Sequence, residues 1–352
     1  MTPHTHEPPG NDFILGELLK NVSRSFYLTL RVLPEALRVP IGLAYLLARA
    51  ADTIADTELV SPQQRLEHLL AFRVQVNHGC DSESLIRIES SFSRHQRDSH
   101  ERTLLNSLRP ALELTHALSP ADRAEVRAVV TTLTTGMEFD LLTFPLESSG
   151  QIAALKNIGE LDHYTFLVAG CVGEFWTKMT AVHTPALHEW NIFEMSQTGI
   201  RFGKALQLTN VLRDCAKDLR IGRCYLPLDL LNEAGLTPAD LLKPGNAARA
   251  RPILVNLLHV ALRHFAAAED YILAIPPTCG RLRLACLWPV LIGLSTLKKI
   301  AENPDWLNPE RPSKVTRGYV KRTLALSLPV VGSDTLIRMW IDTLLRGVEE
   351  KL

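Results

Sequence analysis

The sequence predicts an all-α protein, and three observations support that prediction. Apolar residues recur at three- and four-residue spacing along almost the whole chain, which is the period of an amphipathic helix. The strict alternation that is typical of strands is scarce. Glycine and proline gather between the periodic runs, where they punctuate helices. We therefore expect roughly a dozen helices, with clear examples at 13–19, 44–55, 253–265 and 336–348.

Length and composition are those of an ordinary globular protein. The chain has 352 residues, of which 46% are hydrophobic and 22% are charged. That length is enough for one large domain or two small ones. No linker stands out, so we expect a single helical domain over residues 13–352. Residues 1–12 are polar and proline-rich and lack the apolar core of a signal peptide, so we expect a disordered lead-in there.

Charge and motif content exclude several classes of protein. The 38 lysines and arginines balance 38 aspartates and glutamates, so the chain has no strongly basic surface and we expect no nucleic-acid partner. The sequence contains no G-x-G-x-x-G, no G-x-x-x-x-G-K-[ST] and no H-E-x-x-H. Rossmann, P-loop and zinc-protease folds therefore have no motif support.

Cysteine usage and hydropathy both bear on location. The six cysteines show neither CxxC spacing nor zinc-type grouping. Cys171, Cys215 and Cys286 lie in apolar segments or in segments with helical periodicity. This indicates buried free thiols and fits a reducing cytosol. The most apolar long run, 284–297, has 14 residues, too few to span a bilayer, so we expect a buried helix. We expect a cytoplasmic protein without a signal peptide or a transmembrane anchor, whose contact with membranes is peripheral.

The stretch 202–227, FGKALQLTNVLRDCAKDLRIGRCYLP, contains a carboxylate pair. Asp214 and Asp218 lie four residues apart, so on a helix both project from one face. Two amides share that stripe and an arginine borders it, namely Gln207, Asn210 and Arg213. A polar row on an otherwise apolar helix is costly to bury unless something inside needs it. Because such pairs are also common on solvated helix faces, this stretch alone leaves both explanations open.

A second carboxylate pair repeats the design. A helix is predicted from about Pro40 to Asp56, because proline suits the first turn of a helix. Asp52 lies four residues before Asp56, and Tyr45 and Arg49 fall on the same face. With two such helices in one chain, a pair of unrelated solvated faces becomes the weaker explanation.

The two pairs make chemical sense together if they face each other across a cavity. Mg²⁺ is commonly held by one or two carboxylates plus substrate phosphates, so two pairs could hold Mg²⁺ ions against one or two diphosphates. The ions would neutralise the leaving group as a carbon–oxygen bond breaks. Nearby arginines and a tyrosine would donate to phosphate oxygens, and apolar helix faces would shield a carbocation from water. The pattern therefore indicates allylic diphosphate chemistry.

Three other segments each leave two interpretations open. The run 23–26, SRSF, fits a turn or cap as well as a binding segment. Residues 80–101 are polar and serine-rich and suit either a loop or a solvated helix. Ala169, Gly170 and Gly173 are small residues at helical spacing. Glycine in a helix costs about 1 kcal/mol relative to alanine, so either a ligand or a neighbouring helix must approach closely.

Taken together, these segments resemble the squalene and phytoene synthase family, and squalene synthases most closely. The similarity runs from about residue 13 to beyond residue 320. The blocks that match in order are SRSF at 23–26, YLLARAADTIAD at 45–56, HYTFLVAGCVG at 163–173, LQLTNVLRDCAKD at 206–218 and IGRCYLP at 221–227. The first acidic block reads DTxxD, as in squalene synthases, where phytoene-type members usually carry DExxD or DDxxD.

The resemblance implies an isoprenoid (terpenoid) synthase fold with a central cavity. Two farnesyl diphosphates would condense head to head to presqualene diphosphate, which NADPH would reduce to squalene for sterol or hopanoid biosynthesis. By position, the Mg²⁺-binding acids are Asp52, Asp56, Asp214 and Asp218. The diphosphate contacts implied are Ser23, Arg24, Arg49, Gln207, Asn210 and Arg213. Tyr45 and Tyr164 match tyrosines near the ionising carbon, and Lys314 and Arg317 match a basic pair linked to NADPH.

The sequence departs from the family pattern in the part that concerns reduction. The block 281–289, RLRLACLWP, has Trp288 as its only aromatic residue, where squalene synthases carry phenylalanines. Lys314 and Arg317 also suit a solvated helix start. The alternative products are presqualene diphosphate, hydroxysqualene, dehydrosqualene and phytoene. An alternative of another class is a catalytically silent helical assembly module, but such a protein would have no reason to keep acids and arginines on one cavity-facing stripe.

Overall fold

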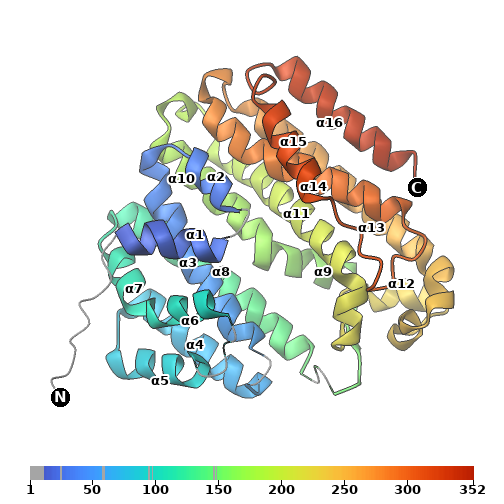
Figure 1. Ribbon diagram of the computed structural model, residues 1–352, viewed down its shortest axis with the longest axis horizontal. Helices are drawn as coiled ribbons and strands as arrows, with labels where there is room; N and C mark the ends of the chain where they lie inside the picture. The colour runs from blue at the N-terminus through green and yellow to red at the C-terminus, as the bar shows by residue number, and fades with distance from the viewer. Residues whose placement is uncertain are drawn as a thin grey trace. The chain divides into compact units, whose positions relative to one another are not determined.

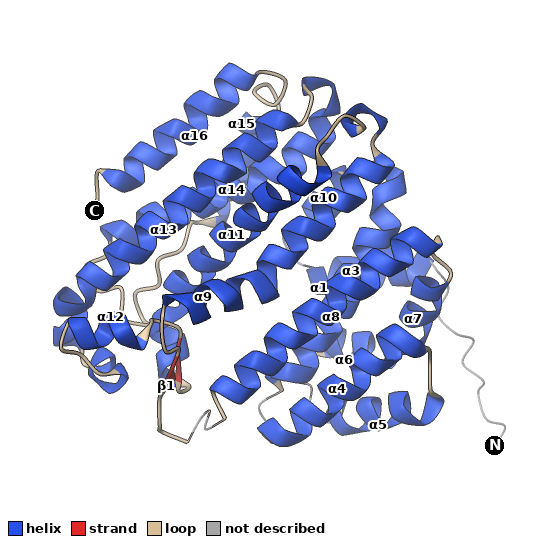
Figure 2. Ribbon diagram, turned by 180° about the vertical axis from the view of Figure 1, so that it is seen from behind, coloured by secondary structure: helices blue, strands red, loops and turns tan. Residues whose placement is uncertain are grey.

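The computed structural model describes residues 12–23, 26–57, 60–93, 96, 98–145, 147 and 149–352. Arg24 and residues 1–11 of the predicted lead-in lie outside the described residues. Helices dominate the described chain, which confirms the all-α prediction (Figure 1). Its only strands are β1 (Ala153–Ala154) and β2 (Arg223–Cys224), drawn red in Figure 2, which pair in parallel over two residues each.

Two compact units make up the fold, with the boundary between Leu141 and Leu142. The helices of the first unit are, in chain order, the π-helical η1 (Phe13–Leu18), α1 (Leu19–Ser23), α2 (Phe26–Val32), α3 (Glu35–Asp56), α4 (Pro62–His78), α5 (Ser82–Ser93), α6 (Ser99–Asn106), α7 (Leu108–His116) and α8 (Pro120–Thr143), whose last turn crosses the boundary. Those of the second unit are α9 (Ile158–Thr165), η2 (Phe166–Gly170), α10 (Cys171–His183), η3 (Pro185–Leu187), α11 (Ile192–Arg220), α12 (Leu228–Glu233), η4 (Pro238–Leu242), η5 (Pro244–Asn246), α13 (Ala247–Ala274), η6 (Pro277–Cys279), α14 (Gly280–Glu302), α15 (Arg317–Ser327) and α16 (Asp334–Glu349).

Helix α3 is the central helix of the first unit, where it packs against α4, α6 and α7. Its buried face includes Leu46, Leu47 and Ile54, none of which is exposed to solvent. Burying each such side chain contributes about 1.5–3 kcal/mol to the free energy of folding. The burial of this face determines which way the opposite, polar face of the helix points. The helix begins at Glu35, so the predicted start at Pro40 is wrong. Pro34 precedes the first turn and suits a helix start equally well.

Among its described residues, the polar stretch 80–101 contains helix α5 and the start of helix α6. Leu85, Ile88 and Phe92 of α5 are buried. Their three- and four-residue spacing is that of an amphipathic helix. The serines and charges that dominate the composition occupy the other face, which is why composition alone was ambiguous. The start of α6 is capped by Asp98, whose carboxylate accepts a hydrogen bond from the His100 backbone N–H at 2.8 Å.

Helix α11 is the central helix of the second unit, and it packs against α10, α13 and α14 (Figure 1). It spans 29 residues and is capped by Asn191, whose side chain accepts a hydrogen bond from the Glu194 backbone N–H. The chain leaves α11 through Gly222, whose φ of 94° is a left-handed conformation that glycine adopts without a steric cost. This turn leads directly into β2, and pairing of Ala153 with Arg223 ties that strand to the segment before α9.

Helix α14 contains the apolar run 284–297 and is buried along most of that run, which confirms the prediction of a buried helix. The segment Pro277–Glu302 is long and apolar enough to cross a membrane by length and composition, but 78% of its most apolar window is buried inside the protein. All six cysteines are free thiols. The three predicted to be buried, Cys171, Cys215 and Cys286, are buried, and so is Cys224.

Candidate functional site

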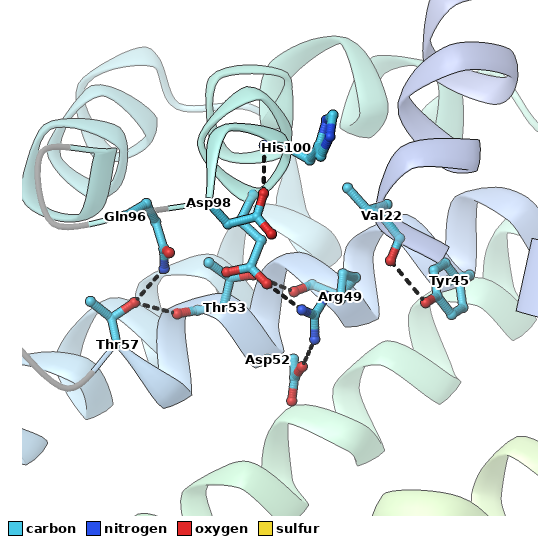
Figure 3. A network of polar contacts seen from close by, with 10 residues as sticks. Val22, Tyr45, Arg49, Asp52, Thr53, Thr57, Gln96, Asp98 and His100 are labelled. Carbon is cyan, nitrogen blue, oxygen red and sulfur yellow. Dashed lines mark hydrogen bonds and ion pairs between the residues drawn. The ribbon is translucent and has the colours of Figure 1, made fainter. Parts of the chain in front are cut away.

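The first candidate face lies on α3, which bears Tyr45, Arg49, Asp52 and Asp56. The Arg49 guanidinium donates from Nη1 to Asp52 Oδ2, and this contact is drawn in Figure 3. Its other terminal nitrogen, Nη2, donates to Oε1 of Glu101 on α6. One arginine therefore holds two carboxylates, one from its own helix and one from a neighbouring helix.

The charges on this face influence one another strongly. Partial burial, followed by repulsion from Asp56, raises the pKa of Asp52 to about 6, although Arg49 acts in the opposite direction. For Arg49 itself, burial lowers the pKa, but attraction to Asp52 and Glu101 outweighs it and raises the pKa above its usual value. A bound cation would relieve the repulsion between the two aspartates. The donor set of this face therefore fits a hard divalent cation.

The end of α1 reaches the same face. Tyr45 Oη donates a hydrogen bond to the Val22 carbonyl oxygen at 3.4 Å, as Figure 3 shows. The next residue, Ser23, is 2% exposed, and its hydroxyl has no hydrogen-bond partner among the residues that the structure describes. A buried hydroxyl without a partner is costly, so Ser23 retains an unused donor beside the face that bears Tyr45.

The second candidate face lies on α11, in the second unit. Arg213 donates to both carboxylate oxygens of Asp214, from Nε to Oδ1 at 3.0 Å and from Nη2 to Oδ2. The Asn210 side chain donates to Gln207 Oε1 at 3.3 Å. The amides, Arg213 and both aspartates of this stripe are half-buried. The stripe predicted from sequence is therefore present on α11, with Asp218 one turn beyond Asp214.

An aromatic cluster adjoins α9 in the second unit. Tyr164 is buried and stacks on Tyr225, with ring centroids 4.9 Å apart and an interplanar angle of 27°. Tyr225 also meets Phe144 edge to face at 5.1 Å. The sequence pattern alone indicates no role for Tyr225. Tyr225 directly follows β2, so its position against Tyr164 depends on the pairing of β1 with β2. Each strand has only two residues, too few to be recognised in the sequence.

Arg317 is the first residue of α15 and Lys314 lies three residues before it, and both are exposed. The side chain of Thr316 caps this helix by accepting a hydrogen bond from the Tyr319 backbone N–H at 3.1 Å. Trp288 on α14 is buried, and its indole N–H donates to Ser327 Oγ at 2.8 Å. The only aromatic residue of the block 281–289 is therefore tied to the last residue of α15.

Glu101 of α6 contacts the α3 face, and the sequence pattern does not reveal this contact. The pattern Asp98 followed three residues later by Glu101 is a helix-start signal, so the helix could have been predicted. Its contact with Arg49 could not, because the two residues are 52 positions apart. No group of three or more His, Cys, Asp or Glu side chains among the described residues could hold a metal ion. Each face thus offers a pair of carboxylates, which suits Mg²⁺ bound together with substrate phosphates.

Comparison with known proteins places the chain in a family. The squalene/phytoene synthase family model matches residues 19–319. The chain is 26% identical over 336 residues to squalene synthase ERG9 from Saccharomyces cerevisiae, which covers 96% of this chain and 70% of that protein. It is 27% identical over 291 residues to a phytoene synthase from Arthrospira platensis, which covers 81% of each. It spans 62% of the squalene synthase of Eremothecium gossypii, at 25% identity over 291 residues.

Solved structures share the fold. TcSQS in complex with the ligand E5700 matches with a TM-score of 0.73 at 19% identity, over 96% of this chain and 97% of that one. A dehydrosqualene synthase in complex with a ligand matches with a TM-score of 0.58 at 18% identity, over 94% and 95%. The predicted isoprenoid synthase fold is thereby confirmed. With the family match extending over most of its length, the chain belongs to the squalene/phytoene synthase family.

Proposed function

We propose that this member of the family, a transferase of isoprenoid biosynthesis, is a Mg²⁺-dependent squalene synthase that joins two farnesyl diphosphates. The observation that supports this most is that α3 and α11 each present an aspartate pair with an arginine bound to one member. That arrangement matches what diphosphate release needs, namely carboxylates for cations and guanidinium groups for phosphate oxygens. Relatives named squalene synthases, such as the one from Saccharomyces cerevisiae, add support for the choice of substrate.

The aspartates of both faces, Asp52, Asp56, Asp214 and Asp218, would hold Mg²⁺. Bound Mg²⁺ would neutralise the diphosphate as its bond to carbon breaks. Arg49 and Arg213 would donate to diphosphate oxygens when their aspartate partners turn to the cation. Ser23, Arg24, Gln207 and Asn210 would add neutral and charged donors around the same groups.

The tyrosines would act on the carbon side of the reaction. The stack with Tyr225 fixes the ring of Tyr164, and an aromatic face stabilises a cation electrostatically. Tyr45 is held through its hydroxyl by the Val22 carbonyl. We assign both tyrosines to the surroundings of the ionising carbon. The buried apolar side chains of the helices would keep water from the carbocation.

The second half of the reaction would use NADPH to reduce presqualene diphosphate to squalene. Arg317 at the start of α15 and Lys314 just before it are exposed cations that would bind the phosphate of NADPH. We propose that residues 13–352 act as one domain in the cytoplasm, with peripheral membrane contact limited to release of the apolar product.

A second candidate function stops before reduction. In the block 281–289, Trp288 is the only aromatic side chain, and it is buried against Ser327. The relatives also include a phytoene synthase and a dehydrosqualene synthase. On this alternative the product would be presqualene diphosphate, hydroxysqualene, dehydrosqualene or phytoene.

One assay separates these functions. The protein is incubated with farnesyl diphosphate and Mg²⁺, with and without NADPH, and the products are identified by mass spectrometry; geranylgeranyl diphosphate is the parallel substrate. We expect squalene only when NADPH is present. Presqualene diphosphate or hydroxysqualene that persists with NADPH would support the shorter reaction, and phytoene from the C20 substrate would support a phytoene synthase. No turnover of either substrate would leave the silent assembly module as the explanation.

A further inference from the structure

Arg49 lies between two carboxylates that differ in their exposure. The side chain of Asp52 is 41% exposed, that of Arg49 is 24% exposed, and that of Glu101 is 18% exposed. Arg49 Nη1 faces Asp52 and Nη2 faces Glu101. The guanidinium therefore has a more open partner on its own helix and a more buried partner on α6.

We propose that Glu101 is a positioning residue for diphosphate binding, acting through Arg49. This inference rests on the proposed function of the α3 face. Glu101 holds the guanidinium from its buried side. Asp52 can then turn from Arg49 to a cation while the arginine keeps both its charge partner and its orientation toward the diphosphate.

The chemistry of arginine explains why a second carboxylate is needed. Its five N–H donors lie in one rigid plane, so holding one edge of the plane fixes the direction of the others. Arg49 Nε is buried and has no hydrogen-bond partner among the described residues. If Asp52 were the sole partner, its departure would leave a half-buried cation unpaired, which is costly. Glu101 removes that cost, because it stays bound when Asp52 leaves.

The backbone that carries Glu101 is itself fixed. Asp98 caps the first turn of α6 through the His100 backbone N–H, as Figure 3 shows. The Thr103 hydroxyl donates to the Ser99 carbonyl oxygen at 2.9 Å in the same turn. Helix α6 packs against α3. Glu101 is therefore presented to Arg49 from a capped turn on a packed helix, which suits an anchor better than a group that must move.

A direct metal-binding role for Glu101 fits the structure less well. Its carboxylate is bound by Arg49 and is less exposed than that of Asp52, so a cation from solvent reaches it less readily. No metal-capable group of three or more side chains exists among the described residues, so Glu101 does not join Asp52 and Asp56 in one cluster. A metal ligand and a positioning residue also differ in what they change. Loss of a ligand weakens the response to Mg²⁺, whereas loss of the anchor weakens diphosphate binding at saturating Mg²⁺ and does so only through Arg49.

The test compares Glu101→Gln and Glu101→Asp with wild type. Glu83→Gln is the matched control, because Glu83 lies in the first turn of α5 and is exposed. Calorimetry measures binding of inorganic pyrophosphate at saturating Mg²⁺, steady-state assays measure KM and kcat for farnesyl diphosphate, and circular dichroism checks folding. We expect Glu101→Gln to weaken pyrophosphate binding and raise KM by about tenfold, as expected for one lost charge-assisted hydrogen bond. Glu101→Asp should recover part of this, and Glu83→Gln should match wild type.

A double-mutant cycle with Arg49→Lys separates positioning from a general structural effect. Because Glu101 acts through the guanidinium fork, Glu101→Gln should change pyrophosphate binding by less than about twofold in the Arg49→Lys background. Wild-type pyrophosphate affinity in folded Glu101→Gln, or an equal loss in both backgrounds, would overturn the inference. A change confined to the Mg²⁺ requirement would also overturn it in favour of a metal ligand. If Glu101→Gln weakens pyrophosphate binding as expected but wild type turns over no prenyl diphosphate, the proposed function fails while the inference stands.

Discussion

Gly173 on α10 and Gly199 on α11 bring the backbones of their two helices into contact. A β-carbon at Gly173 would lie 1.8 Å from the Gly199 carbonyl oxygen. At Gly203, one turn further along α11, a β-carbon would lie 2.2 Å from the carbonyl oxygen of Ala169. Of the two explanations that the sequence allows for the small residues at 169–173, close helix packing accounts for Gly173. This contact helps to fix α11, the helix that bears the second aspartate pair.

Replacing Gly173 by alanine should therefore destabilise the protein. The added methyl group meets backbone rather than a flexible side chain, so the helices must separate. We expect a loss of about 1–3 kcal/mol in the free energy of unfolding, measured by urea denaturation. Gly16→Ala is the control, because a β-carbon there meets nothing within 4 Å. Equal stability of Gly173→Ala and wild type would show that the helices do not pack as described.

The free energy of unfolding at mildly acidic pH should depend on His264 of α13. Burial, followed by the nearby Lys204, Arg201 and Arg263, lowers the pKa of His264 to about 4, although Asp162 acts in the opposite direction. The folded state thus keeps His264 neutral between its ordinary pKa of 6.5 and about 4. The unfolded chain takes up a proton in that window, so the free energy of unfolding falls as the pH falls through it.

Urea denaturation at pH 7 and pH 5 measures this effect. We expect wild type to lose more stability between these two values than His264→Asn does. His259→Asn is the control, because His259 is an exposed histidine on the same helix. The prediction is wrong if wild type and His264→Asn show the same difference between the two pH values.

Four of the six thiols should be unreactive in the folded protein. Burial raises the pKa of Cys171, Cys224 and Cys286 to about 12, and it also raises the pKa of Cys215. Since only the thiolate reacts readily, these cysteines should resist iodoacetamide at pH 8 until the protein is unfolded. Peptide mass spectrometry should find early labelling only at the half-buried Cys80 and Cys279. Rapid native labelling of Cys215 would contradict the described packing of α11.

The features predicted well from sequence are those that depend on local spacing. Asp52 lies four residues before Asp56 on one helix, and Asp214 lies four before Asp218 on another, so each pair shares a face wherever its helix packs. The burial of 284–297 likewise follows from its composition. Local signals are weaker at the ends of helices. Pro34 and Pro40 are both compatible with the start of α3, and the helix begins directly after Pro34.

The features that sequence did not reveal are contacts between distant segments. Glu101 meets Arg49 only because α6 packs on α3. Tyr225 stacks on Tyr164 only because β2 pairs with β1. Neither contact has a characteristic spacing, since it depends on how separate elements pack. The polar composition of 80–101 also made α5 hard to predict, although its buried residues Leu85 and Ile88 have helical spacing in the sequence.

Release of pyrophosphate from farnesyl diphosphate tests most directly whether both aspartate pairs serve one reaction. Wild type, Asp52→Asn, Asp214→Asn and the control Asp270→Asn, which changes an exposed aspartate on α13, are compared with and without Mg²⁺. We expect Mg²⁺-dependent release by wild type and by the control. Release should fall on the order of 10³-fold in each of the other two variants, with unchanged circular dichroism, because each loses a carboxylate that holds the charge-neutralising cation. Near wild-type release by folded Asp52→Asn or Asp214→Asn would contradict the assignment.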